Sequence, residues 1–167
     1  MILIVSYSSA FGGAERALVD VAPALENAVL ACPEGPLARA ARERDLAVLA
    51  LQKRSLEARG SVGASVLAAA RLATHGREIR ELVASLDPEL VIAGGMRSAI
   101  AALVGPAIGC PVVFQHNDLL PSAAIGAVVR RAARRASVVL APSRTVAADL
   151  DPSGILANRL VVVHPGV

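Results

Sequence analysis

Short apolar segments alternate along this chain with stretches of helical periodicity, and this alternation constrains the fold more than any other feature. Each apolar segment is a near-continuous run, which indicates a strand that is covered on both faces. Strands and helices in alternation predict an α/β fold, a doubly wound parallel sheet of about seven strands with helices on both faces. The expected strands are residues 2–5, 28–31, 47–51, 90–93, 112–114, 138–141 and 160–163.

The segments between the strands carry apolar residues three and four positions apart, which is the spacing of one helical face. Pro23 is expected to disturb the last turn of the first helix, because proline removes a backbone hydrogen bond. Residues 52–63 show little periodicity and are predicted to form a mobile loop. The predicted buried stripes are Ala14, Ala17, Leu18, Val21, Ala22 and Leu25; Ile79, Leu82, Val83 and Leu86; and Ile100, Leu103, Val104, Ala107 and Ile108.

Length and composition limit the class of protein. A chain of 167 residues predicts one domain, residues 1–167, and 54% hydrophobic residues exclude disorder. The apolar runs are too short to span a membrane, and the first lacks the basic lead of a signal peptide, so a cytoplasmic protein is expected. The chain stops just after its last predicted strand, which is expected of a domain cut at a linker to an absent C-terminal domain.

The cysteines and aromatic residues exclude further classes. Cys32 and Cys110 are too few and too far apart to predict a disulfide scaffold or a zinc site, and both are expected to be small buried hydrophobes. Aromatic residues make up 2% of the chain and tryptophan is absent, so the aromatic platforms on which single-stranded nucleic acid stacks are missing. No nucleic-acid partner is therefore expected.

Gly12 and Gly13 stand between the first predicted strand and the first predicted helix. Glycines let the backbone approach a ligand closely, and the following helix directs unpaired N–H groups and its positive dipole end to the same place. A phosphate fits such a junction. A tight turn without a ligand explains the glycines equally well, because glycine turns are common at such positions.

Ligands of an open parallel sheet bind beyond the carboxyl ends of its strands. Residues 7–13, 94–97, 115–118 and 142–144 follow predicted strand ends and are expected to converge on one cleft. The residues expected in this cleft are Phe11, Arg16, Gly95, Arg97, Asn117, Asp118 and Ser143.

His116 is the most informative titratable residue, because it follows a strand and is trailed by Asn117 and Asp118. A histidine there fits a hydrogen bond to a sugar hydroxyl or the orientation of a reacting group, although a structural histidine fits as well. His75 is expected to be solvated. Ser143 is interpreted as a helix N-cap, and Gly94–Gly95 is interpreted as a turn in preference to a second anion-binding helix start.

Several enzyme classes are disfavoured by missing motifs. The glycine loop has neither the Gly-x-Gly-x-x-Gly spacing of a dinucleotide fold nor a Gly-Lys-Ser/Thr phosphate loop. The chain also lacks the Gly-x-Ser-x-Gly elbow of a hydrolase. Dehydrogenase, nucleotide-hydrolysing and serine-hydrolase chemistry are therefore not expected.

The predicted helix 125–136 carries a basic side. Its apolar stripe is Ile125, Val128, Val129, Ala132, Ala133 and Ala136. An ordinary solvated face is favoured for the opposite side, and a contact with an anionic membrane surface is the alternative. The basic residues are Arg130, Arg131, Arg134 and Arg135.

Several segments together resemble the N-terminal domain of family 4 retaining glycosyltransferases. Residues 12–18 (GGAERAL) look like the "GGAER-hydrophobic" start of that domain. The strand that ends in His116 continues the resemblance, and residues 136–143 (ASVVLAPS) resemble the "AD-hydrophobic-S" segment. Residues 160–167 (LVVVHPGV) are similar to the closing "PNGVD" segment.

The resemblance implies the GT-B fold, in which two Rossmann-like domains enclose the active site. This chain corresponds to the N-terminal, acceptor-binding half, expected to be inactive without the nucleotide-sugar domain. Gly12 and Gly13 match backbone that contacts the donor diphosphate, and His116 matches the residue that touches the transferred sugar. The implied donor is a nucleotide-sugar, the acceptor is a sugar, lipid or metabolite, and neither a metal nor another cofactor is expected.

Two alternative functions remain on the sequence alone. One is half of a GT-B sugar-nucleotide epimerase, which shares the architecture. The other, from a different class, is a stand-alone binding or regulatory module without catalysis.

Overall fold

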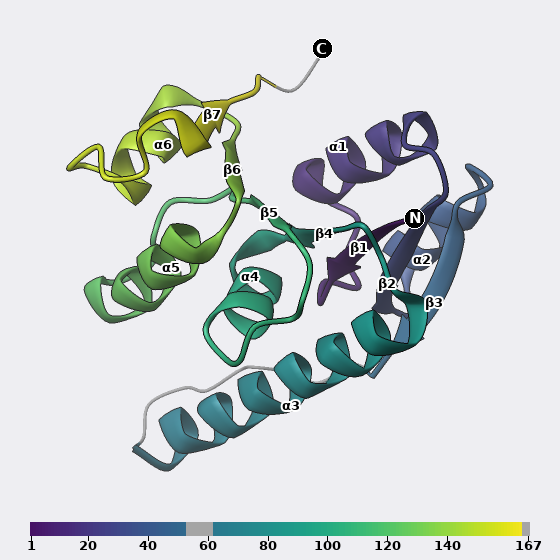
Figure 1. The fold of residues 1–167 in the computed structure, drawn as a ribbon, viewed down its shortest axis with the longest axis horizontal. Coiled ribbons are helices and arrows are strands. Elements are labelled where there is room, and N and C mark those ends of the chain that lie inside the picture. The colour runs from purple at the N-terminus through teal and green to yellow at the C-terminus, as the bar shows by residue number, and fades with distance from the viewer. Residues whose placement is uncertain (53–61, 165–167) are drawn as a thin grey trace.

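The computed structural model describes residues 1–52 and 62–164, with the side chains of residues 62–71 left out. Within these residues, seven parallel strands form one sheet in the order β3-β2-β1-β4-β5-β6-β7 (Figure 1). The strands are β1 Ile2–Ser6, β2 Ala28–Pro33, β3 Ala47–Leu51, β4 Leu90–Gly94, β5 Val112–Gln115, β6 Val138–Ala141 and β7 Leu160–Val162.

Helices connect consecutive strands, as the alternation predicts. The helices are α1 Gly13–Val21, α2 Pro36–Arg42, α3 Val62–Leu86, α4 Gly95–Leu103, α5 Ala123–Arg135 and α6 Arg144–Leu150, with 3₁₀ turns η1 Ala22–Ala24 and η2 Ala157–Arg159. The prediction of a doubly wound parallel sheet is confirmed. Most of the loop predicted over 52–63 falls at residues 53–61, outside the described residues, whereas Gly63 lies within α3 instead of a loop.

Alternate residues of each central strand face opposite sides of the sheet. Leu3 and Val5 of β1 pack into the core cluster that includes residues of α3, α4 and α5, whereas Ile4 packs into the cluster that includes α1 and α2. Figure 1 shows α1 on one side of the strands and α3 and α4 on the other. Both clusters are apolar, which explains why the central strands read as continuous hydrophobic runs.

One half of the sheet is covered less completely than predicted. The register aligns Val113 with Val138 and Leu140 with Val161, so these side chains share the face on which α1 and α2 cover the other strands. Val161 is 41% exposed, and Val163 just beyond β7 is 52% exposed. We call Val113, Val138, Leu140, Val161 and Val163 the open sheet face. The prediction of cover on both faces is wrong here, for the residues that the structure describes.

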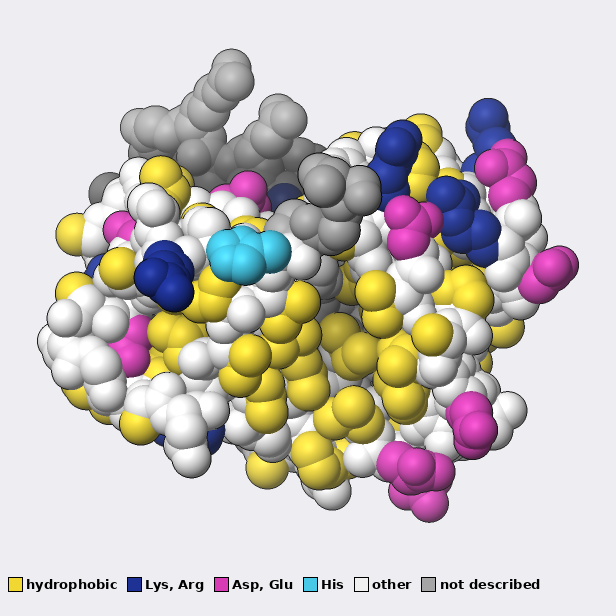
Figure 2. All heavy atoms as spheres, turned by 90° about the horizontal axis from the view of Figure 1, so that it is seen from above, with side chains coloured by type: hydrophobic (Ala, Val, Ile, Leu, Met, Phe, Trp, Pro, Cys, Tyr) yellow, Lys and Arg dark blue, Asp and Glu magenta, His cyan; other side chains and the backbone are white. Residues whose placement is uncertain are grey.

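Hydrophobic side chains gather across the middle of the molecular face seen in Figure 2, and charged side chains lie mainly toward its edges. This is the side of the molecule on which α1 and β7 lie at the top of Figure 1. An apolar area of this kind is typical of a surface that packs against another part of a protein or a partner.

The first helix ends earlier than its apolar pattern predicts. α1 stops at Val21, and the 3₁₀ turn that contains Pro23 follows directly. The buried face of α1 runs through Leu18, Val19 and Ala22, so Val21 on the neighbouring face is 57% exposed although it was predicted to be buried. Val19 is fully buried in its place.

His75 is buried, so the prediction of a solvated side chain is wrong. Its ring stacks on the Tyr7 ring with 3.8 Å between centroids, and the Tyr7 hydroxyl donates to the His75 carbonyl oxygen at 3.0 Å. These contacts hold the segment after β1 against α3. α3 also lies close to α4, because a Cβ placed on Gly76 would lie 2.7 Å from the Ala101 carbonyl oxygen.

Two of the four arginines predicted on the solvated side of α5 also bind backbone carbonyls, and of the four only Arg130 is partly buried. Arg130 donates to the Leu150 oxygen at 3.0 Å and Arg135 to the Leu103 oxygen at 2.8 Å. These carbonyls belong to the last turns of α6 and α4, where a helix leaves acceptors unpaired. Arg131, Arg134 and Arg135 are exposed, as predicted.

The cysteines follow their prediction in part. Cys32 is fully buried in β2, whereas Cys110 is partly exposed, and both are free thiols. Burial, with a smaller contribution from the charge of Glu34, raises the pKa of the Cys32 thiol to about 11. The neutral thiol behaves as a small core hydrophobe.

Candidate functional site

A cavity of about 510 Å³ opens at the carboxyl ends of β1, β4 and β5. β1 and β4 are adjacent in the sheet but not in the chain, so the strand order reverses between them. Such a switch point leaves a crevice because the flanking connections run to opposite faces of the sheet. The residues that line it are Ser6 to Ala10, Ala14, Glu15, Leu18, Leu37, Gly94 to Arg97, Gln115, Asn117 and Asp118.

α1 contributes Ala14, Glu15 and Leu18 to one wall of the cavity, and the glycine turn that begins the helix lies next to this wall. Gly12 is the N-cap, and its backbone N–H donates to the Glu15 Oε2 atom at 3.0 Å. The first backbone bond of the helix runs from the Arg16 nitrogen to the Gly12 oxygen at 2.9 Å. The amides of Gly13, Ala14 and Glu15 precede that bond and are the free N–H groups of a helix N-terminus, which favour an anion.

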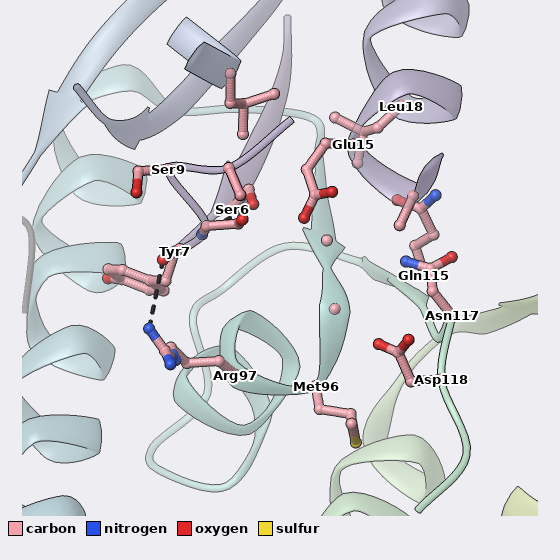
Figure 3. Close-up of a pocket in the computed structure, with 16 residues that line it drawn as sticks. Ser6, Tyr7, Ser9, Glu15, Leu18, Met96, Arg97, Gln115, Asn117 and Asp118 are labelled. Atoms are coloured by element: carbon pink, nitrogen blue, oxygen red, sulfur yellow. Dashed lines mark hydrogen bonds between the residues drawn. The ribbon is translucent and has the colours of Figure 1, made fainter. Parts of the chain in front are cut away.

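Glu15 therefore has a part that the sequence did not predict. Its carboxylate satisfies one amide of the glycine turn and points into the cavity from α1 (Figure 3). The Gly-x-x-Glu spacing of residues 12–15 contains this signal, since a glutamate at the third helical position typically reaches back to the N-cap amide. An anion bound at the start of α1 would therefore lie beside the negatively charged carboxylate of Glu15.

Arg97 lies on a second wall, in the first turn of α4. β4 runs into α4 without a loop, because Gly94 is both the last strand residue and the helix N-cap and Gly95 adopts a φ of 80°. Gly95 and Arg97 both line the cavity, as predicted. Gly94 and Gly95 start a helix at the cavity, and their interpretation as a plain turn in preference to an anion-binding site stays a prediction.

The third wall follows β5 and carries the side chains of Gln115, Asn117 and Asp118. In Figure 3 these side chains lie across the cavity from Arg97 and Tyr7. The Gln115 Oε1 atom is buried and has no hydrogen-bond partner within the described residues. Amide and carboxylate groups of this kind suit hydroxyl-rich ligands, because they supply both donors and acceptors.

His116 sits between these residues in sequence but is fully buried and does not line the cavity. Its backbone nitrogen donates to the Leu140 oxygen at 2.8 Å, and its ring centroid lies 5.3 Å from that of Phe114. Burial lowers the pKa of His116, and the charges of Asp118 and Asp149 oppose this effect. The role predicted for His116 stays a prediction.

The lowered pKa of His116 predicts acid sensitivity of the fold. At neutral pH the folded and unfolded states both hold the ring neutral, but below about 6.5 the unfolded state takes up a proton first. The free energy of unfolding should therefore fall by roughly 1 kcal/mol as the pH drops from 7.5 to 5.5. Urea unfolding at both pH values measures the free energy of unfolding. In a His116→Gln variant this free energy should fall by roughly 1 kcal/mol less than in the wild type over the same pH range. An equal decrease in the wild type and the variant would contradict the assignment of this pH dependence to His116.

Other predicted site residues are not among those that line the cavity, namely Phe11, Gly12, Gly13, Arg16 and Ser143. Phe11 is partly buried against the α1–α2 core cluster, with the guanidinium carbons of Arg16 and Arg44 at 5.6 and 5.8 Å from its ring centroid. Ser143 caps α6 and accepts from the Val146 nitrogen at 3.2 Å, which confirms the N-cap interpretation. The expected convergence thus holds for the ends of β1, β4 and β5, whereas residues 142–144 are not on this wall.

Across residues 1–52 and 62–164, no three His, Cys, Asp or Glu side chains are grouped as ligands of a metal ion. Over the same described part, no helix combines the length and apolarity that a membrane crossing requires.

Solved structures share this fold over nearly the whole chain. HepE of Anabaena, solved in complex with UDP-glucose, is 21% identical with a TM-score of 0.74, covering 99% of this chain and 44% of HepE. WaaB, a lipopolysaccharide outer core galactosyltransferase, is 18% identical with a TM-score of 0.68, covering 99% of this chain and 45% of WaaB.

A putative UDP-N-acetylglucosamine 2-epimerase of Listeria monocytogenes is 10% identical with a TM-score of 0.61, covering 95% of this chain and 43% of that protein. At these identities the likeness concerns the fold, which is that of the N-terminal Rossmann-like domain of GT-B proteins. The chain spans less than half the length of each of these proteins.

The structural likeness identifies only the fold, whereas comparison of the sequence with family models identifies the family. No curated protein sequence matches this chain. The model of Glycosyltransferase Family 4 matches residues 11–167, which include the glycine junction, the β5 loop and the last strand. The chain therefore belongs to glycosyltransferase family 4.

Proposed function

We propose that this chain is the acceptor-binding half of a retaining glycosyltransferase that moves a hexosyl group from a nucleotide-sugar to an acceptor. The observation that carries the proposal is the cavity at the switch point between β1 and β4, with the start of α1 on its wall. Family membership supports the reaction class. HepE, which shares the fold, is solved with UDP-glucose, and this supports a nucleotide-sugar as the donor.

The donor diphosphate is proposed to bind at the free amides of Gly13 and its neighbours at the start of α1. These amides and the helix dipole stabilise the negative charge that develops on the leaving diphosphate. Glu15 already occupies the Gly12 amide, so the diphosphate takes the remaining N–H groups or displaces the carboxylate. In this proposal the reaction depends on positioning and charge stabilisation and requires neither a protein nucleophile nor a metal.

The acceptor is proposed to occupy the cavity between α4 and the loop after β5. Asn117 and Asp118 supply hydrogen-bonding groups for its hydroxyls. His116 remains the proposed contact of the transferred sugar, at the end of the same strand. Since its ring is buried in this structure, that contact requires a movement of the β5 loop on ligand binding.

A second, nucleotide-sugar domain is part of the proposal. The chain spans less than half of the solved proteins that share its fold. The open sheet face supports the need for a further protein segment, because a parallel sheet is normally covered on both faces. Without that domain, we propose that the chain alone does not turn over a nucleotide-sugar.

The test is product analysis of a protein in which this chain is joined to a nucleotide-sugar domain. Incubation with UDP-glucose and a panel of acceptors should yield a glycoside whose anomeric configuration matches that of the donor, as measured by NMR. An epimerised nucleotide-sugar would instead assign the chain to a sugar-nucleotide epimerase. Binding without any turnover would assign it to a non-catalytic module, and turnover by the isolated chain would contradict the need for a second domain.

Peripheral contact with an anionic membrane through α5 is a second part of the proposal. Ile125 and Val128, predicted to be buried, are 44% and 38% exposed, and Arg131 and Arg134 lie on the same helix. Apolar and basic side chains together suit a surface of anionic headgroups. Such a contact would place a cytoplasmic enzyme beside the inner face of the membrane.

Liposome binding tests this contact. Replacing Arg131 and Arg134 together with serine should weaken binding to phosphatidylglycerol vesicles by about 2 kcal/mol, roughly thirtyfold. Arg130 and Arg135 are kept, because their bonds to helix-end carbonyls are structural. The control replaces Arg39 and Arg77, exposed arginines of α2 and α3, with serine. Equal binding by the test and control variants would leave α5 as ordinary solvated surface.

A further inference from the structure

Arg97 is bonded differently from most other arginines with described contacts. Arg42, Arg44 and Arg77 pair with carboxylates, whereas Arg130, Arg135 and Arg159 donate to backbone carbonyls at 2.8 to 3.1 Å. Arg97 is partly buried, yet within the described residues its side chain makes a single hydrogen bond, to the Tyr7 carbonyl oxygen at 3.4 Å. A guanidinium carries five N–H donors, so most of its capacity is unused.

The charge of Arg97 is also uncompensated. No carboxylate of the described residues lies within ion-pair distance of it, and burial alone lowers the pKa of the guanidinium. Arginine nevertheless stays charged in proteins. A partly desolvated cation beside a cavity is stabilised by an anion that enters the cavity, and the planar guanidinium suits two parallel hydrogen bonds to phosphate or carboxylate.

The cavity is polarised from one wall to the other. Figure 3 shows Arg97 beside Tyr7 on one side, with Asp118, Asn117 and Gln115 on the other. A ligand that spans the cavity therefore meets a cation at one end and acceptors of hydroxyl hydrogen bonds at the other. The volume of about 510 Å³ is within the usual range for a small-molecule site.

Resting on the proposed function, we propose that the acceptor carries an anionic group, a phosphate or a carboxylate, which Arg97 binds while Asn117 and Asp118 hydrogen-bond to hydroxyls of the same molecule. The donor diphosphate is a different anion at a different place. It is proposed to lie at the start of α1, whereas Arg97 belongs to α4, and the Glu15 carboxylate lies on the α1 side of the cavity. The acceptor is therefore a hydroxylated anion such as a sugar phosphate or a sugar acid.

The test is an NMR titration of the 167-residue chain with three matched hexoses at constant ionic strength. Glucose 6-phosphate supplies a phosphate, glucuronate supplies a carboxylate, and glucose supplies neither. The anionic probes should shift the Arg97 side-chain Nε–H signal and the Asn117 amide signals in a saturable way, and glucose should not. The probe that binds more tightly shows whether the anionic group of the acceptor is a phosphate or a carboxylate.

Matched variants assign the binding to Arg97. Arg97→Gln should weaken the anionic probe at least about tenfold, the value of one charge-assisted hydrogen-bonded contact. Arg97→Lys should keep part of the affinity, and Arg39→Gln, on the exposed surface of α2, should bind like the wild type. Thermal unfolding of each variant checks that the fold is intact.

The outcomes separate this inference from the proposed function. Equal binding by Arg97→Gln, or shifts confined to the amides of Gly13 and Ala14, would overturn the Arg97 site. In the two-domain protein, Arg97→Gln should raise KM for an anionic acceptor and leave KM for the donor unchanged. Absence of sugar transfer together with intact Arg97-dependent binding would overturn the proposed function and leave the anion site standing.

Discussion

Replacing Gly13 with leucine is expected to reduce sugar transfer by about a hundredfold or more in the two-domain enzyme, without loss of the fold. The expected size is that of a lost oxyanion-type donor, because a leucine side chain would block the approach of the diphosphate to the first amides of α1. Within the chain the substitution is tolerated, since a Cβ at Gly13 would meet no atom within 4 Å. Leucine also has a higher helix propensity than glycine, by up to about 1 kcal/mol.

Initial rates at saturating acceptor and varied donor concentration measure this effect, and circular dichroism with thermal unfolding checks the fold. Ala84→Leu is the control, because it places the same leucine side chain at an exposed position near the end of α3, which leads into the start of β4 and not to its carboxyl end. Wild-type rates in Gly13→Leu would rule out diphosphate binding at the start of α1. Equal rate losses in both variants would point to a general effect of added apolar surface.

Replacing Phe114 with alanine is expected to lower the free energy of unfolding by about 3–5 kcal/mol, the usual cost of deleting a buried aromatic side chain. Phe114 is fully buried in β5, and its neighbours on the adjacent strands are the smaller Ala93 and Val139. Such small neighbours fill little of the resulting cavity. The β5 loop, with Asn117 and Asp118, would lose its support as well.

Phe11 provides the matched control, as the only other phenylalanine in the chain. It is partly buried beneath Arg16 and Arg44, so Phe11→Ala should cost roughly 1–2 kcal/mol from lost apolar burial and cation–π contact. Urea unfolding followed by circular dichroism compares the two variants. A loss in Phe114→Ala no larger than that in Phe11→Ala would show that the core around β5 closes over the cavity.

Most of the strands were predictable because the signal for a buried parallel strand is local. A run such as residues 2–5 is apolar at every position, and both faces of β1 are indeed buried in core clusters. The same signal misled at β7, where Val161 is apolar but exposed. A hydrophobic run indicates that its side chains are more stable when buried. Whether they are buried depends on which other parts of the protein pack against them.

Side chains whose partners are distant in sequence were predicted less well. His75 looks solvated beside Gly76 and Arg77, yet it is buried under Tyr7, whose position comes from the end of β1. Arg130 and Arg135 look like a charged helix face, but the ends of α6 and α4 give them carbonyl partners. Periodicity along one helix contains no information about which other helix ends nearby.

The sequence by itself determined the α/β class, the strand positions and the strand ends at which a ligand site would form, because these depend on patterns within a few residues. Tertiary structure decided that the ends of β1, β4 and β5 share a cavity, while residues 142–144 do not line it. It also directed Glu15 to that cavity and buried His116. The physical reason is that strand order and helix packing join segments far apart in the chain, which no local pattern encodes.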